Sequence, residues 1–373
     1  MGPGTGEEHL QSRQIGLDYL RGLVIVLVVL HHSVLAYCSF GNFNVRHYLW
    51  STAPIVDPQR WLGFDILVLF NDSYFMPLMF LLSGLFVRPS LQRKGARAYL
   101  LDRGRRLMLP FALAVLTIIP LAYYPSFRMT GSEITFGAFW DQTISEGPWP
   151  SGPAWFVAVL FGFDVVAAAG SRLVRHVELA RTAGSFGVLA TVTLVAYVPL
   201  LLVFGPSRWF AWGPLTVQAS RVLLYAAYFF VGMLSGPSLR ITGRWPVPLA
   251  VLLFALLLAV AAGQLMSPGL LAPTGWQVLH GICVGLFCAG ATRAMLAVFT
   301  TAERRFAICD SLSANAFGIY LIHYVFVVWT QYALLDWPAG PVEKAAIVFS
   351  LALGLSWGLS AGFSRLRSVA GFQ

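Results

Sequence analysis

Charged residues are scarce in this chain. Only 11% of its 373 residues are Asp, Glu, Lys or Arg, whereas soluble domains carry about 25%. Hydrophobic residues make up 57% of the sequence, and its mean hydropathy is +0.71. This balance excludes an ordinary soluble domain and indicates a protein that crosses a membrane several times.

Cysteine is also rare. The chain contains Cys38, Cys283, Cys288 and Cys309, and no two of them form a C-x-x-C pair. Three of the four lie in apolar segments, where cysteine most often serves as a small buried hydrophobe. No disulfide framework is therefore predicted.

Acidic residues are fewer than basic ones, and the formal net charge is +9. A positive total in a membrane protein follows from the Lys and Arg residues that collect in cytoplasmic loops. We therefore expect anionic membrane lipids as partners, and no nucleic acid.

Ten apolar stretches are long enough to cross about 30 Å of hydrocarbon. The second is the least regular, because Asp65, Asn71 and Asp72 interrupt it. The membrane-embedded part of this stretch could therefore begin near Tyr74, and residues 61–72 could form a separate interfacial or re-entrant segment. The stretches cover about residues 17–40, 61–87, 105–126, 153–171, 184–205, 218–236, 246–266, 276–299, 312–335 and 343–363.

The basic residues test this topology. With the N-terminus in the cytoplasm, seventeen Lys and Arg residues fall in inner segments and five in outer loops, which agrees with the positive-inside rule. The predicted fold is all-α and polytopic, with about ten transmembrane helices and both termini cytoplasmic. We expect a disordered leader over residues 1–12, a single transmembrane domain over 13–365 and a short cytoplasmic tail over 366–373.

The first span carries an unusual polar face. Arg21 and His32 are eleven residues apart, almost three helical turns, so they share a face about 16 Å apart along the axis. Asp18 precedes Arg21 by three residues, a spacing that permits an ion pair. Even mild scales set the cost of Arg at the bilayer centre at about 2.5–3.5 kcal/mol. Arg21 could alternatively reach lipid phosphate, and His32 could be a hydrogen-bonded packing residue.

Other ionisable side chains also lie at membrane depth. His31 points about 100° away from His32, whereas paired helical metal ligands are spaced i, i+4, so no metal site is expected. Each of the remaining groups could line a polar cavity with His32, or could be a buried and satisfied polar group. They are Asp164, His280, Arg293 and His323.

Seven basic residues gather in one inner segment, residues 88–106. Arg103 and Arg106 are spaced i, i+3 and can face the same way on a helix. This cluster could bind a polyphosphate, although the positive-inside rule and anionic lipid also account for its charge. Before it, Ser83 and Gly84 lie within a segment, PLMFLLSGLF, and permit close helix packing.

These motifs together resemble the acyltransferase 3 family of integral-membrane O-acyltransferases. The resemblance covers essentially the whole chain and rests on the order and spacing of the motifs. Met76 and Pro77 stand where some members have two prolines, which favours the branch of glucan succinyltransferases. The matching elements are Arg21 and His32 in the first span, PLMFLLSGLF, the R-x-x-R of Arg103 and Arg106, and SANAFGIYLIHYV near the end.

The resemblance implies transfer of an acyl group, commonly acetyl or succinyl, from acyl-CoA to a hydroxyl of a carbohydrate or glycosylated acceptor. It implies that His32 acts in the transfer and that arginines bind the donor. We therefore expect His32, Arg21 and Asp18 as catalytic residues. Arg103, Arg106 and Ser83 are the candidate donor-binding residues.

In this hypothesis acyl-CoA enters from the cytoplasm and no cofactor is permanently bound. Its phosphates meet Arg103 and Arg106, its pantetheine arm passes Arg21, and His32 is the general base, because histidine titrates near neutral pH. A covalent acyl-histidine is an open variant. Some members carry a C-terminal hydrolase-like domain, which we do not expect here.

Two other classes of function fit the same sequence. One is a multi-span transporter or flippase for a glycan or glycolipid, because ten spans with polar residues at depth suit transport. The other is a structural membrane subunit, in which Arg21 and His32 would pair with a partner helix. In each case we expect a multi-pass protein of the cell (inner or plasma) membrane.

Overall fold

The structure, a computed structural model, describes residues 4–147, 149–171, 184–237, 239, 245–300 and 304–369, with side chains described from residue 15 to 366. Its architecture is almost entirely helical. The helices are α1 (Gly4–Leu35), α2 (Leu62–Gly84), α3 (Val87–Lys94), α4 (Ala96–Arg103), α5 (Leu109–Leu113), α6 (Ile119–Arg128), α7 (Phe136–Ser145), α8 (Trp155–Gly170), α9 (Phe186–Phe204), α10 (Val222–Ser235), α11 (Pro246–Met266), α12 (Pro273–Phe299), α13 (Ala307–Ala333) and α14 (Pro341–Val369).

Short elements join or interrupt these helices. The strands β1 (Trp209–Trp212) and β2 (Leu215–Gln218) form an antiparallel hairpin in which Trp209 pairs with Gln218. Two π-helical segments, Gly104–Met108 and Ala114–Ile118, connect α4, α5 and α6 into one continuous helical rod. Single 3-10 turns are found at Tyr48–Trp50, Gly152–Ala154, Ala219–Arg221 and Pro268–Leu270.

Every predicted span coincides with a helix. Within the described ranges, nine helical segments are long and apolar enough to cross a membrane. The stretch predicted at 218–236 corresponds to a shorter apolar helical segment, Ala219–Ser235. Helices suit this setting because they satisfy their backbone polar groups internally. The prediction of an all-α polytopic membrane protein is thus confirmed.

Proline marks the beginning of several of these helices. Pro246, Pro273 and Pro341 are the first residues of α11, α12 and α14. Proline suits this position because the first backbone N–H groups of a helix have no partner within the helix. The start of each helix is therefore encoded locally in the sequence.

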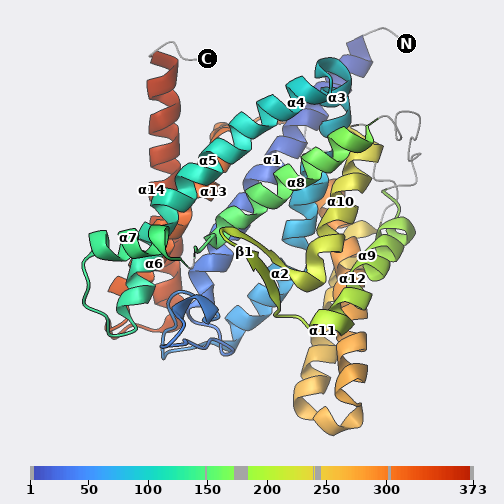
Figure 1. Ribbon diagram of the computed structural model, residues 1–373. Helices are drawn as coiled ribbons and strands as arrows, with labels where there is room; N and C mark the ends of the chain where they lie inside the picture. The colour runs from blue at the N-terminus through green and yellow to red at the C-terminus, as the bar shows by residue number, and fades with distance from the viewer. Residues whose placement is uncertain are drawn as a thin grey trace.

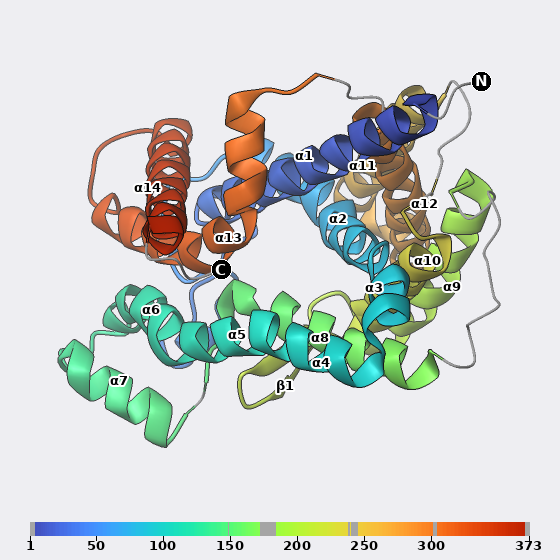
Figure 2. The same cartoon turned by 90° about the horizontal axis from the view of Figure 1, so that it is seen from above.

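The helices surround α1 and α2. Figure 1 shows that α1 begins and α14 ends at the same end of the molecule, as an even number of crossings requires. In Figure 2, α13 and α14 lie on one side of this centre, α9 to α12 lie on another, and the α4–α6 rod runs beside α8. α1 packs against α2 and α13, and α2 packs against α10.

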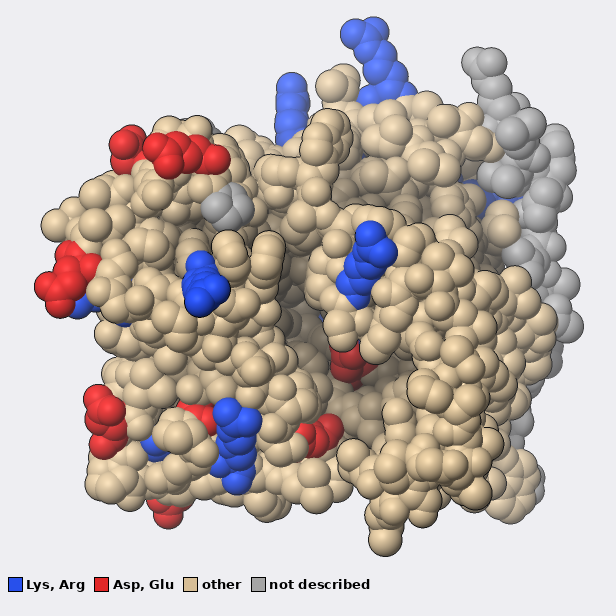
Figure 3. All heavy atoms as spheres, turned by 60° about the horizontal axis from the view of Figure 1, so that its bottom comes forward, with Lys and Arg blue, Asp and Glu red and all other residues tan. Residues whose placement is uncertain are grey.

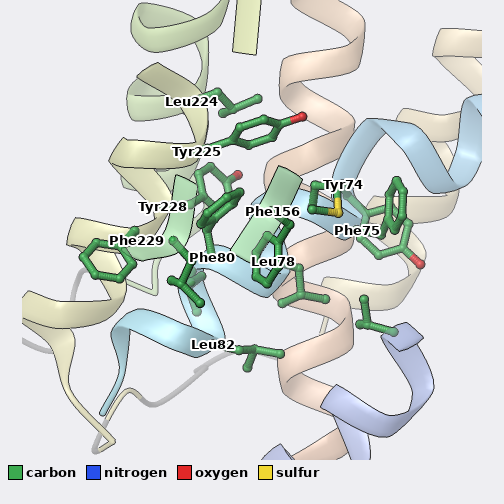
Figure 4. Close-up of a cluster of buried hydrophobic side chains, with 14 of the residues drawn as sticks. Tyr74, Phe75, Leu78, Phe80, Leu82, Phe156, Leu224, Tyr225, Tyr228 and Phe229 are labelled. Carbon is green, nitrogen blue, oxygen red and sulfur yellow. The ribbon is translucent and has the colours of Figure 1, made fainter. Parts of the chain in front are cut away.

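The core is rich in aromatic side chains where α2, α8 and α10 meet (Figure 4). Phe80 of α2 lies 4.7 Å from Phe156 of α8 and 5.0 Å from Tyr225 of α10 between ring centroids. Tyr228 and Phe229 are fully buried nearby. These contacts fix α2, which carries several polar residues, against its neighbours.

The structure differs from the sequence prediction within α2. This helix is continuous from Leu62, which corrects the expectation of a separate piece at 61–72. α1 starts at Gly4, and α14 continues to Val369.

Two glycines allow α2 and α10 to approach closely. A Cβ at Gly84 would overlap the carbonyl oxygen of Phe229, and a Cβ at Gly232 would overlap that of Leu81. We expect Gly84→Ala to lower the stability by about 1–3 kcal/mol, the usual cost of overpacking. Thermal unfolding in detergent measures the change.

Gly354→Ala provides the matched control, because Gly354 lies within α14 and a Cβ there meets nothing within 4 Å. This substitution should raise the stability by about 0.5–1 kcal/mol, since Ala has the higher helix propensity. Equal shifts in both variants would show that close packing at Gly84 is unimportant.

Candidate functional site

α1 carries Arg21 and His32 on one uninterrupted helix. The eleven-residue register therefore holds, and the two side chains are about 16 Å apart along the axis. Arg21 Nη1 donates to Asp18 Oδ1 at 3.0 Å, the ion pair that the spacing predicts. Arg21 Nη2 donates to the Leu82 carbonyl at 3.3 Å, and the guanidinium lies 4.7 Å from the Phe86 ring centroid. Arg21 is thus held against the end of α2.

Arg103 is oriented by a buried partner on α8. Its Nε lies 3.0 Å from Asp164 Oδ2 and 3.3 Å from the Tyr99 hydroxyl, and Tyr99 also donates to Asp164. No hydrogen bond joins the two terminal guanidinium nitrogens to a described residue, and a quarter of the side chain is exposed. Two charged donors are thus left for a ligand, as an anion-binding arginine requires.

Arg21 and Arg103 lie near enough for their positive charges to repel each other. Like charges placed side by side are stabilised when an anion binds between them. Arg106 has different surroundings: it pairs with Asp102 at 2.9 Å and is 71% exposed. The structure therefore brings Arg103 toward Arg21, whereas Arg106 remains at the surface.

Ser83 has a local role in the structure. Its hydroxyl donates to the Met79 carbonyl one turn earlier in α2, at 2.8 Å. Such back-bonding is common for serine in membrane helices. The side chain is half-buried, and no hydrogen bond joins it to Arg21 or Arg103 among the described residues.

His32 meets His323 of α13. His32 Nδ1 lies 3.1 Å from His323 Nε2, and the ring centroids are 5.2 Å apart. Tyr324 packs edge-on against His32 with a centroid distance of 5.0 Å. His323 is fully buried. The pairing joins residues 291 positions apart, so the sequence showed both histidines but not their contact.

The hydrogen bonds assign the protons of this pair. His323 Nδ1 lies 2.7 Å from the Tyr320 carbonyl and 3.2 Å from the Ile319 carbonyl. Since both neighbours are acceptors, Nδ1 carries the proton and Nε2 accepts. His32 must then donate through its own Nδ1, which leaves His32 Nε2 unprotonated. The Val28 carbonyl, one turn earlier in α1, is a further acceptor beside the ring. With the proton on Nδ1, Nε2 is the nitrogen that can act as a base.

The outer end of α1 is anchored just beyond His32. Gln331 Nε2 donates to the carbonyls of His32 and Ser33, at 3.0 and 3.2 Å. The Asp57 N–H donates to the Ala36 carbonyl at 2.9 Å, and Asp57 forms a buried ion pair with Lys344 at 2.8 Å. α13 and α14 therefore fix the position of the histidine.

A second polar cluster lies beside His31. Arg221 donates to the Asp72 carboxylate at 2.5 Å and to the Asp72 carbonyl at 2.8 Å. In the sequence, Asp72 only interrupts the second apolar stretch, and Arg221 lies within the stretch predicted at 218–236. Both side chains carry a charge at membrane depth, and this shared feature is the sequence signal that could have suggested an ion pair between them. Figure 3 shows that the face opposite the chain ends is hollowed, with acidic atoms inside the hollow.

The cysteines supply no evident nucleophile. All four thiols are free, and Cys283 and Cys288 are buried within α12. Cys38, just past the end of α1, is also buried, and burial with the nearby Asp65 carboxylate raises the pKa of its thiol to about 12. A thiol is nucleophilic as the thiolate, so the histidine pair is the better candidate for reactive chemistry.

Comparison with known proteins identifies the family of the chain. No curated protein and no solved structure matches the chain. A sequence model of a family described as an acyltransferase domain matches residues 14–361, which include the charged groups of α1, the arginine at the end of α4 and the histidine of α13. The chain therefore belongs to the acyltransferase 3 family and is a multi-pass membrane acyltransferase.

Proposed function

We propose that the protein transfers an acetyl- or succinyl-type group from cytoplasmic acyl-CoA to a hydroxyl of a carbohydrate or glycosylated acceptor, in the cell (inner or plasma) membrane. The observation that carries the proposal is the histidine pair. It leaves His32 Nε2 free to accept a proton, while His323 holds the ring through its other nitrogen. This is the arrangement of a general base with an orienting partner.

The donor site is formed by Arg21 and Arg103. Their repulsion favours a polyanion, which suits the phosphates of CoA. Arg103 binds them through its free terminal nitrogens, and Asp164 sets the direction of its guanidinium. The acyl thioester then extends along α1 toward His32, over a distance comparable with the length of a pantetheine arm.

The transfer itself is a simple exchange. His32 Nε2 removes the proton of the acceptor hydroxyl as the hydroxyl oxygen bonds to the thioester carbonyl carbon. The carbon–sulfur bond breaks, and CoA leaves as a thiolate that takes up the proton. His323 stabilises the imidazolium by accepting its Nδ1 hydrogen bond. The acceptor ester and free CoA are the products.

Two measurements test this proposal. Mass spectrometry of envelope glycans, with and without the gene, should show a mass difference of one acetyl or one succinyl unit. Purified protein in liposomes should release CoA from acetyl-CoA or succinyl-CoA when an extract of those glycans is present. A transporter would bind the glycan without releasing CoA, so absence of CoA release from both donors would refute the enzyme reaction.

The donor site has its own test in the same assay. Arg103→Ala should raise KM for acyl-CoA by about tenfold or more, the effect of losing a charge-assisted hydrogen bond. Arg305→Ala removes the same charge from an exposed position before α13 and should leave KM unchanged. An equal response of the two variants would show that Arg103 contributes only general positive charge.

A further inference from the structure

The pair of Asp72 and Arg221 lies among α2, α9 and α10. Arg221 directs both terminal nitrogens at Asp72, and the hydroxyls of Tyr197 and Tyr225 also interact with its guanidinium. Arg221 is only 9% exposed. Its donors are thus occupied by the protein, and its role is to hold Asp72 in place.

Asp72 itself is accessible. Its side chain is 41% exposed, although it lies at membrane depth in α2 and beside the buried Asn71 and Ser73. Arg221 contacts Oδ2, so Oδ1 is directed at no described donor. A carboxylate in this setting needs hydrogen-bond donors from water or from a ligand.

Buried polar atoms without partners surround the pair. His31 Nδ1 and His280 Nδ1 make no hydrogen bond with the described residues, and both histidines lie within electrostatic reach of Arg221. The hydroxyl of Ser220, adjacent to Arg221, is also buried and unpartnered. A buried polar group left unsatisfied costs about 1–3 kcal/mol. Several in one place indicate a site completed by a polar ligand.

This cluster adjoins the proposed base. The rings of His31 and His32 are 5.5 Å apart between centroids. His31 also packs against the ring of Phe75, one turn after Asp72 in α2, at a centroid distance of 5.2 Å. Resting on the function proposed above, we infer that Asp72 and His31 form the acceptor subsite and bind a neutral, hydroxyl-rich molecule.

The charges select this class of ligand. The pair of Asp72 and Arg221 carries no net charge, and its more accessible member is the carboxylate. A carboxylate accepts hydrogen bonds from hydroxyl groups but repels carboxylate and phosphate ligands. An acidic sugar would therefore bind poorly at this position. The anionic donor instead meets Arg21 and Arg103 at the other end of the α1 face.

Ligand binding can be measured without turnover. Saturation-transfer NMR on the full-length protein, in an amine-oxide detergent that has no sugar headgroup, uses methyl glucoside and myo-inositol as neutral probes and gluconate as the anionic probe. We expect transfer to a neutral probe and little to gluconate. Asp72→Asn should weaken neutral-probe binding by about tenfold, the effect of one charge-assisted hydrogen bond. Asp336→Asn, at an exposed position after α13, should bind like the original protein.

Two further variants address folding. The double variant Asp72→Asn with Arg221→Gln leaves no unpaired charge and should bind the neutral probes as weakly as Asp72→Asn alone. His31→Phe should also weaken the binding of these probes. Absence of binding to both neutral probes, preference for gluconate, or undiminished binding in these variants would overturn the inference. Failure of the proposed function would be seen in a separate assay, as absence of CoA release by the unsubstituted protein.

Discussion

Replacing His32 with alanine should reduce acyl transfer by about 10²–10⁴-fold, the usual contribution of a general base. The loss should be in kcat, with KM for acyl-CoA little changed, because Arg21 and Arg103 are untouched. His32 packs against His323 and Tyr324 but is not fully enclosed, so the variant should fold. CoA release in liposomes measures the rate. Near-normal kcat in this variant would remove His32 from the mechanism.

Substitutions of His323 test whether the His32 base depends on a partner that orients its ring. His323→Ala removes the acceptor for His32 Nδ1, so the ring can turn or change tautomer, and activity should fall less than in His32→Ala. His323→Gln retains an acceptor oxygen and should recover part of the loss. His47→Ala, an exposed histidine in the connection after α1, is the matched control. Equal activity of the alanine and glutamine variants would show that His323 only fills space.

The membrane helices were predictable because hydropathy sums over about 20 residues and survives local exceptions. The continuity of α2 was not. Asp65 and Asp72 made residues 61–72 look unlike a span, yet Ser39 donates to Asp65 and Arg221 pairs with Asp72 in the folded chain. Arg221 lies 149 residues from its partner. Polar residues inside a span are thus tolerated through contacts that a single sequence cannot show.

The same limit applies to the candidate site. The pairing of Asp18 with Arg21 follows from helical spacing and was predicted. Arg103 and Arg106 share a face only on a regular helix, and the π-helical segment that starts at Gly104 changes the angular step between them. The contact of His32 with His323 depends on how α1 packs against α13. Local periodicity thus identified the residues, and only tertiary structure showed their partners.

Breaking the ion pair of Lys344 with Asp57 should destabilise the protein by about 3–5 kcal/mol, because both side chains are 1% exposed and the remaining charge would be buried alone. Lys344 also donates to the Leu335 carbonyl at 3.1 Å, so Lys344→Met removes two hydrogen bonds. Among the described residues, no other charged side chain pairs with the Asp57 carboxylate; Arg60 donates to its backbone carbonyl instead. Thermal unfolding in detergent measures the loss.

A double variant distinguishes the effect of an unpaired buried charge from the effect of altered packing. Lys344→Met with Asp57→Asn leaves no unpaired charge and should recover most of the stability, since a buried ion pair contributes little net stability over neutral residues. Glu343→Gln, an exposed neighbour, should change the stability by less than about 0.5 kcal/mol. Because Asp57 holds the end of α1 just beyond His32, Lys344→Met should also lower kcat in the fraction that remains folded. If kcat per folded molecule is unchanged, this anchor stabilises the fold but does not position the base.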